Sequence, residues 1–388
     1  MRPSAAPIAA FYLALCGAMG LYLPYLSLYL SSVGLSESAA VRVQAVIPLM
    51  SLFVPPLLGV LADARHVRVW LLRGFSAAAA LMFAVLGLAG HDAGAITVVL
   101  AAFALARSPL MALTDATAHE HVRHHGGSYG RLRTWGSLGF LLAALLAGKL
   151  YDLSSIGMVV WVTTAALGVL FLCAWWMPAP TPRRELGMLD EVRRLLRTRA
   201  LWLLLAAISV GQVAGTWYDA TLALHLGHLG YGKDFLGLVV AIGVGAETVL
   251  IAASGSILTR FRSQHTLAAA FAVSALRWLF LSLATSRIAI LAQAPLHAFS
   301  FGLYWVSATT LVREYAGPRA SAAGQGLLTA AVAVGSIAAN LSGGALLERG
   351  GGRLVFGIAA GVTASAAVLA ALHAATSRAE TPANSGFS

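Results

Sequence analysis

The chain has 388 residues, of which 59% are hydrophobic and only 11% are charged. Soluble domains carry about 25% charged and about 45–50% apolar residues. This composition excludes an ordinary soluble enzyme, a nucleic-acid-binding domain and a disordered protein, and it predicts a polytopic membrane protein that lies in the lipid bilayer. The formal net charge is +11, but most basic residues lie in loops, where they indicate orientation and not a nucleic-acid partner.

Twelve apolar windows are long enough to cross a membrane, which takes about 20 helical residues. We expect the spans at residues 5–32, 39–62, 67–89, 94–119, 128–150, 155–177, 200–226, 234–258, 266–284, 287–312, 320–346 and 353–375. The first window exceeds the core of a signal peptide, about 7–15 residues, so we interpret it as the first span. The windows lack the two-residue alternation of barrel strands, and the predicted fold is therefore all-α.

A polar segment divides the windows into two groups of six. Residues 178–199 contain three prolines and six arginines. We predict an N-terminal six-helix half at 1–177, a cytoplasmic linker at 178–199, a C-terminal six-helix half at 200–376 and a cytoplasmic tail at 377–388. Two such halves with a binding site near the membrane midplane are a frequent plan among transporters.

Basic residues concentrate at the N-terminus, in alternate loops, in the linker and in the tail. Cytoplasmic loops carry the excess of lysine and arginine in membrane proteins. The pattern predicts that both termini lie in the cytoplasm and that the chain resides in the inner (plasma) membrane.

Ionisable residues near the middle of spans are the strongest functional signal. Such a group costs at least about 2.5–3.5 kcal/mol on insertion scales, and Glu247, Arg277 and His297 lie at matching depth in three consecutive spans. A carboxylate beside an arginine can change its proton occupancy, and a histidine titrates near physiological pH. We predict that these residues, with Asp219 in the seventh span, couple transport to protons; the alternative is a static ion-pair network that fixes helix packing.

A second set of charges lies in the first half. Asp115 and Arg133 are placed at similar depth by the short hairpin between the fourth and fifth spans, and we expect them to pair and to bind substrate or, alternatively, to serve packing alone. Arg107 lies about 12 Å along the helix from Asp115 by the rise per residue, and it either faces the cleft or pairs with Asp219. A cleft-facing arginine favours an anionic substrate such as a carboxylate.

Aromatic residues give a weaker signal. Tyr25, beside a proline, and Tyr218, beside an aspartate, lie within spans. We predict that both contact substrate, with packing and the interfacial aromatic belt as the alternative.

The loop after the second span carries a charged motif. Gly59, Asp63 and Arg65 lie in a predicted cytoplasmic turn, and this arrangement resembles the G-x-x-x-D-x-R signature of the major facilitator superfamily. The resemblance covers the whole chain through the spans, the linker and this motif. It implies that the loop gates conformational change; the alternative is a solvated turn.

Local segments resemble the lactose-permease and phenylpropionate-permease branch of that superfamily. The similar segments are residues 20–25, 243–247, 275–278 and 295–299. The resemblance implies that Glu247, Arg277 and His297 serve proton coupling and substrate contact. Ser300 departs from the pattern of lactose permease, which has a carboxylate one turn after the histidine, so the proton-carrying role falls more heavily on Glu247 or Asp219.

The segment at 128–139 resembles the fifth-span motif of the same branch. The spacing from Asp115 to Arg133 also matches lactose permease, where the pair contacts substrate. The resemblance therefore implies a substrate-binding role for both residues.

We expect a secondary active transporter and not an enzyme, because phosphate-loop, nucleophile-elbow and paired-cysteine motifs are missing from the sequence. Four histidines at 119–125 lack the partners of a metal site, so we expect no metal, no catalytic residues and no cofactor. The predicted mechanism is proton symport of a small organic solute (a sugar, nucleoside or aromatic carboxylate) by a monomer. The alternatives are an efflux antiporter, a membrane-embedded transferase and a binding protein that does not translocate.

Overall fold

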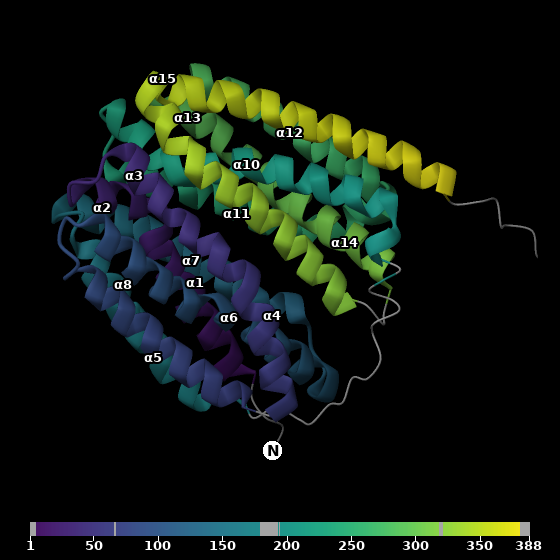
Figure 1. Cartoon of the computed structure of the whole chain (residues 1–388), viewed down its shortest axis with the longest axis horizontal. Coiled ribbons are helices and arrows are strands. Elements are labelled where there is room, and N and C mark those ends of the chain that lie inside the picture. Colours follow the sequence, from purple (N-terminus) through teal and green to yellow (C-terminus); the bar gives the residue numbers. More distant parts are fainter. Residues whose placement is uncertain (1–4, 66, 179–192, 194, 318–320, 381–388) are drawn as a thin grey trace, which may run out of the picture. The chain divides into compact units, whose positions relative to one another are not determined.

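The computed structural model describes residues 5–65, 67–178, 193, 195–317 and 321–380, and within these ranges it contains helices and no strands (Figure 1). The prediction of an all-α polytopic fold is confirmed. Helices satisfy their own backbone hydrogen bonds, which is what the hydrocarbon layer requires of a spanning segment.

The first half of the chain contributes six passes. Their helices are α1 (Ala6–Tyr22), η1 (Leu23–Tyr25), α2 (Leu26–Ser32), α3 (Glu37–Arg42), η2 (Val43–Ala45), α4 (Val46–Arg65), α5 (Arg68–Leu86), α6 (Ala93–His125), α7 (Tyr129–Leu153), α8 (Met158–Cys173) and η3 (Ala174–Trp176). The first pass is interrupted at η1 because Pro24 has no N–H to donate to the preceding turn.

The second half contributes the remaining passes. Their helices are α10 (Arg199–His228), α11 (Lys233–Arg260), α12 (Ser263–Leu283), α13 (Arg287–Gln293), η4 (Ala294–Leu296), the π-helix η5 (Ala298–Leu303), α14 (Tyr304–Ala316) and α15 (Ser321–Glu380). Gly350 and Gly351 leave helical geometry inside α15, and Gly351 adopts a φ of 60°, which favours glycine.

The described helices account for the twelve predicted spans. Ten segments are long and apolar enough to cross a membrane by length and composition. One of them, within α15, holds two spans on either side of the Gly350–Gly351 break. The tenth predicted span is divided among α13, η4, η5 and α14, and its pieces are individually short.

Two compact units divide the chain. Unit 1 comprises residues 1–185, 217–245 and 337–355, and unit 2 comprises residues 186–216, 246–336 and 356–388. Helices α10 and α11 therefore contribute one segment to each unit, and α15 contributes its middle segment, 337–355, to unit 1 and the segments on either side of it to unit 2. The division into two six-helix halves stays a prediction.

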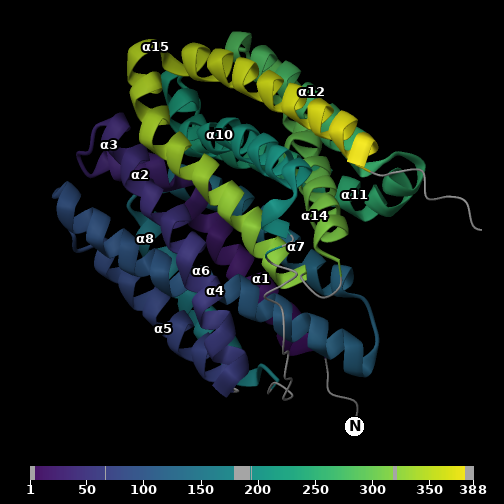
Figure 2. The same ribbon diagram turned by 45° about the vertical axis from the view of Figure 1, so that its right-hand side comes forward.

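Within unit 1, α1 packs against α7 and α8, while α5 packs against α6 and α8 (Figure 2). The contact between α1 and α7 depends on glycines. A Cβ atom on Gly20 would lie 2.4 Å from the carbonyl oxygen of Phe140, and one on Gly139 would lie 2.3 Å from that of Leu13. Small residues let membrane helices approach this closely, and the approach brings the polar residues of α1 and α7 together.

Candidate functional site

The residues predicted for proton coupling meet within unit 2. His297 Nε2 lies 3.4 Å from Glu247 Oε2 on α11. On its other side, the histidine Nδ1 lies 3.3 Å from a terminal nitrogen of Arg277 on α12. The structure thus brings three of the four predicted residues into one chain of contacts, with the imidazole between the carboxylate and the guanidinium.

Two neutral oxygens also contact Arg277, a side chain that is fully buried. Its Nε donates to Gln293 Oε1 at 2.8 Å, and a terminal nitrogen donates to Ser300 Oγ at 2.5 Å. Ser300 occupies the position at which the resemblance implies a carboxylate. The hydroxyl accepts a hydrogen bond there without adding a negative charge, so Glu247 is the carboxylate of this cluster.

The backbone around His297 is irregular. Pro295 lies in η4, and the π-helix η5 begins directly after the histidine. Single π-turns inside helices occur frequently at functional sites. A Cβ atom on Gly302 of η5 would lie 3.2 Å from Glu247 Cγ. Because glycine has no side chain, this position leaves room for Glu247.

A second polar cluster lies within unit 1, where α1, α6 and α7 meet. Asp115 on α6 accepts hydrogen bonds from the hydroxyls of Tyr12 at 2.5 Å and Tyr129 at 3.1 Å. Arg133 lies over the ring of Tyr12 at 5.7 Å, and its NH1 is 3.8 Å from the sulfur of Cys16.

The expected direct pair between Asp115 and Arg133 is wrong in its geometry. Among the described residues the two side chains form no ion pair, because Tyr12 lies between them. Its hydroxyl donates to the carboxylate of Asp115, and its ring face lies against the guanidinium of Arg133. Sequence reasoning missed Tyr12 and Tyr129, since a tyrosine within an apolar span is usually a packing residue.

Arg107 also lies in unit 1 and does not pair with Asp219. Its NH1 lies 3.6 Å from the sulfur of Met19 on α1, and no ion pair joins it to Asp219 among the residues described. Arg107 and Asp115 are eight residues apart on α6 and share one helical face. The alternative of an Arg107–Asp219 pair is therefore wrong.

The remaining predicted residues lie outside these two clusters. The Tyr25 hydroxyl donates to the carbonyl oxygen of Ala144 at 2.7 Å, and its ring packs edge-on against Tyr151, which fits a packing role in this structure. Tyr218 is buried, and Asp219 is exposed on α10 within unit 1, so the fourth proton-coupling candidate belongs to a different unit from Glu247.

The predicted gating motif is described only in part. The backbone of α4 extends to Arg65, but the side chains of Gly59, Asp63 and Arg65 lie outside the described residues. Just beyond the motif, Arg68 at the start of α5 donates to Glu120 on α6 at 2.6 Å.

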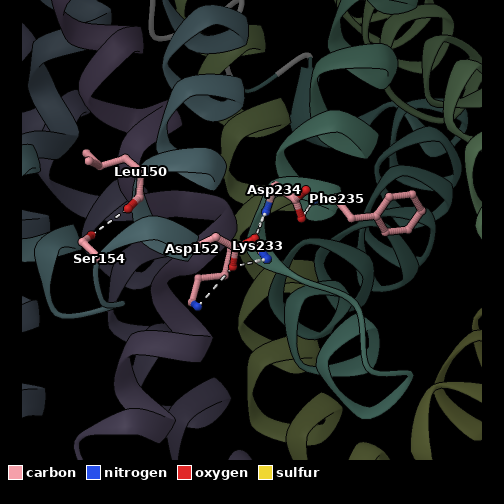
Figure 3. Close-up of polar contacts among 6 residues, drawn as sticks. All are labelled: Leu150, Asp152, Ser154, Lys233, Asp234 and Phe235. Atoms are coloured by element: carbon pink, nitrogen blue, oxygen red, sulfur yellow. Dashed lines mark hydrogen bonds and ion pairs between the residues drawn. The ribbon is translucent and has the colours of Figure 1, made fainter.

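A charged clamp that the sequence did not predict lies at the C-terminal end of α7. Asp152 accepts hydrogen bonds from the backbone N–H groups of Lys233 at 2.9 Å and Asp234 at 3.0 Å, and from Lys233 Nζ at 3.3 Å (Figure 3). The carboxylate thereby caps the first turn of α11, where free N–H groups and the helix dipole favour a negative charge. We refer to these three residues as the Asp152 clamp.

Close backbone contact accompanies the Asp152 clamp. A Cβ atom on Gly148 would lie 2.4 Å from the carbonyl oxygen of Lys233, and one on Gly237 would lie 2.8 Å from that of Ala144. The Ser27 hydroxyl on α2 also donates to the carbonyl oxygen of Ala220 on α10 at 2.6 Å. Within unit 1, the ends of α2 and α7 are thus tied to segments from the second half of the chain.

Sequence comparison points to one family of proteins. The chain matches the MFS_1 like family over residues 6–358. It is 30% identical to a maltose permease of Geobacillus stearothermophilus over 350 residues, which cover 87% of this chain and 86% of that protein. It is 26% identical to a probable 3-phenylpropionic acid transporter of Escherichia coli (strain K12) over 286 residues, which cover 73% and 75% of the two chains.

Solved structures show the same fold. The nucleoside transporter NupG matches with a TM-score of 0.80 at 17% identity, covering 96% of this chain and 99% of that chain. The POT family transporter PepTSo matches with a TM-score of 0.82 at 12% identity, covering 98% and 99%.

These relatives are transporters, so the prediction of a transporter and not an enzyme is confirmed. The family match extends over nearly all the described spans. The chain belongs to the MFS_1 like family and is a multi-pass membrane protein that transports small solutes.

Proposed function

We propose that this protein is a monomeric proton symporter of the inner membrane that carries a small organic solute by alternating access. The observation that carries the proposal is the contact chain from Glu247 through His297 to Arg277 inside apolar helices. Ionisable groups placed there are costly, and proton relays are a common reason for keeping them.

In the proposed mechanism, Glu247 exchanges a proton with water that reaches it from one side at a time. The ionised carboxylate is attracted to His297 and to the guanidinium beyond it. Protonation removes the negative charge, weakens that attraction and lowers the cost of moving the segment through an apolar environment. His297 lies between this carboxylate and Arg277, where an imidazole can pass a proton on or hold it.

Solute binding is assigned to the cluster of unit 1. Asp115, Arg133 and Arg107 supply both signs of charge, and Tyr12 and Tyr129 supply hydroxyls beside an aromatic face. The curated relatives are named for maltose and 3-phenylpropionic acid, and a solved neighbour for nucleosides. Sugars, aromatic carboxylates and nucleosides are accordingly the solute classes to test first.

The proposal includes an orientation. With both termini and residues 178–199 in the cytoplasm, the Gly59–Asp63–Arg65 motif lies on the cytoplasmic side and the Asp152 clamp on the outer side. Alternating access between the halves at 1–177 and 200–376 then requires the Asp152 clamp to release when the outer side opens.

The test is uptake by the purified full chain in liposomes, with maltose, 3-phenylpropionate and a nucleoside as labelled solutes. A gradient that is acidic outside should drive accumulation of one of them. Glu247→Gln should abolish accumulation while leaving exchange across equal concentrations intact, because the neutral amide mimics the protonated carrier.

A matched control is Glu314→Gln, which makes the same change at an exposed glutamate of unit 2. It should accumulate solute as the unaltered protein does. Accumulation under the opposite gradient would instead identify an antiporter, and full accumulation by Glu247→Gln would exclude Glu247 as the coupling residue.

A further inference from the structure

Arg107 is an excess cation within unit 1. It lies in the middle of α6, on the face that Asp115 shares, and it forms no ion pair among the residues described. Arg107, Asp115 and Arg133 all interact electrostatically with Cys16, and Asp115 also interacts with Arg133 and His119. One carboxylate and two guanidiniums leave this cluster with one positive charge uncompensated, and an uncompensated charge inside a membrane protein is costly.

Two polar atoms near this cation have no hydrogen-bond partner in the described part of the chain. They are Arg107 Nε and the hydroxyl oxygen of Tyr22, and both are buried. Arg107 and Tyr22 are close enough to interact electrostatically. A buried polar group left without a partner costs about 1–3 kcal/mol, so two of them beside an excess charge call for an explanation.

The position of the Tyr22 hydroxyl is fixed by its surroundings. The side chain is fully buried, and its ring packs against Phe83 at 5.2 Å and Phe103 at 5.5 Å between ring centroids. Arg107, by contrast, is partly exposed. Arg107 is therefore not completely enclosed by the protein, while the buried Tyr22 side chain has a fixed position beside it.

Building on the transport function proposed above, we infer that the solute is an organic monoanion whose carboxylate is bound by Arg107 with the Tyr22 hydroxyl as a second donor. The planar guanidinium matches a carboxylate through two parallel hydrogen bonds. A single negative charge balances the single excess cation. A sugar or nucleoside brings hydroxyl groups but leaves the charge of Arg107 uncompensated.

The test measures binding at equilibrium, without a gradient, on the purified full chain in detergent. The probes are 3-phenylpropionate, benzoate and hexanoate, each beside its uncharged amide, together with maltose and a nucleoside. Thermal unfolding ranks the probes and calorimetric titration gives the dissociation constants. We expect at least one carboxylate to bind and its amide to bind at least about 10-fold more weakly.

Substitutions then locate the carboxylate. Arg107→Gln should weaken carboxylate binding by about 10-fold to 100-fold, as expected for losing a hydrogen-bonded charge, and Arg107→Lys should weaken it less because the charge remains. Tyr22→Phe should weaken it by about 5-fold. Arg73→Gln is the control, since Arg73 in the same unit lies over Trp175 at 4.3 Å and away from this cluster.

A purely structural Arg107 would give a different result. The solute-free Arg107→Gln protein should unfold at an equal or higher temperature, because an excess cation is removed, and only the stabilisation by carboxylate should be lost. The inference is overturned if no carboxylate binds, if amides bind equally well, or if Arg107→Gln leaves the affinity unchanged. Carboxylate binding is measured at equilibrium in detergent and proton coupling by accumulation in liposomes, so failure of proton coupling and failure of this inference are separate outcomes.

Discussion

The two polar clusters surround a carboxylate inside apolar helices with different kinds of partner. In unit 1, Asp115 is held by the hydroxyls of Tyr12 and Tyr129, groups whose ordinary pKa is about 10. In unit 2, Glu247 contacts the imidazole of His297, whose other nitrogen faces Arg277. The first set of partners consists of hydroxyl donors, whereas the second contains an imidazole, which has both a donor and an acceptor nitrogen.

This difference assigns separate tasks to the two carboxylates. Fixed donors give Asp115 a constant geometry, which suits recognition of a solute. The imidazole between Glu247 and Arg277 gives the glutamate a partner that can relay a proton, which suits coupling. The comparison therefore predicts that substitutions in unit 1 alter affinity, while substitutions in unit 2 alter the dependence on protons.

The largest expected effect is the contrast between Glu247→Gln and Asp115→Asn. The first should abolish accumulation under a proton gradient with little change in solute affinity. The second should weaken solute affinity by about 10-fold or more, the size expected for an interaction with a charged group, and should leave the proton-to-solute ratio unchanged. Both are measured with the same liposomes, by the ratio of solute inside to outside and by the concentration for half-maximal exchange.

The contrast fails if either variant shows the other's defect. Loss of accumulation with intact affinity in Asp115→Asn would place proton coupling in unit 1. A changed affinity with intact accumulation in Glu247→Gln would make Glu247 a solute-binding residue.

Gly302 gives a test that leaves every charge in place. A valine side chain there would displace Glu247, since even a Cβ atom would lie 3.2 Å from its Cγ, and overpacking of this kind costs about 1–3 kcal/mol. We expect Gly302→Val to lower accumulation by about 10-fold while exchange falls much less. Gly326→Val is the control, because a Cβ atom on Gly326 meets nothing within 4 Å; equal losses in both variants would indicate a general effect on folding.

The spans and the charged residues of unit 2 were predictable because placing an ionisable group in the hydrocarbon layer has a large free-energy cost. Ionisable residues are expensive within apolar windows, so Glu247, Arg277 and His297 stand out in the sequence, and matching depth in consecutive spans predicts their contact. Tyr12 did not stand out, because a tyrosine inside a span is cheap and common. Sequence spacing placed Asp115 and Arg133 at one depth but could not reveal the side chain from α1 that separates them.

The Asp152 clamp was unpredictable for a related reason. A charge at the end of a span costs little, so Asp152 reads as an ordinary loop residue in the sequence. Its role depends on the start of α11, which is 81 residues away along the chain. Only the close approach at Gly148 and Gly237 brings the carboxylate to those N–H groups.

Release of the Asp152 clamp should change access to unit 1 without altering either cluster. Asp152→Asn removes the charge that holds two backbone N–H groups and Lys233 Nζ. With a cysteine at Ser27 as reporter, in a chain lacking Cys16 and Cys173, we expect an impermeant maleimide added outside to label about 5-fold faster. Asp92→Asn is the control, because Asp92 caps its own helix α6; equal rates in both variants would show that the Asp152 clamp does not hold the outer side closed.

The smallest expected effect comes from Tyr129→Phe, and it is the most exact test of the division between clusters. Tyr129 contributes the longer of the two hydroxyl contacts to Asp115, at 3.1 Å, whereas Tyr12 contributes one at 2.5 Å and also supports Arg133. We expect Tyr129→Phe to weaken solute affinity by about 3-fold and Tyr12→Phe by about 10-fold, measured by exchange at equal concentrations on both sides. Neither phenylalanine variant should change how accumulation depends on pH, because neither hydroxyl titrates near neutrality. A shifted pH dependence in Tyr129→Phe would mean that the carboxylate of unit 1 shares the transported proton with Glu247.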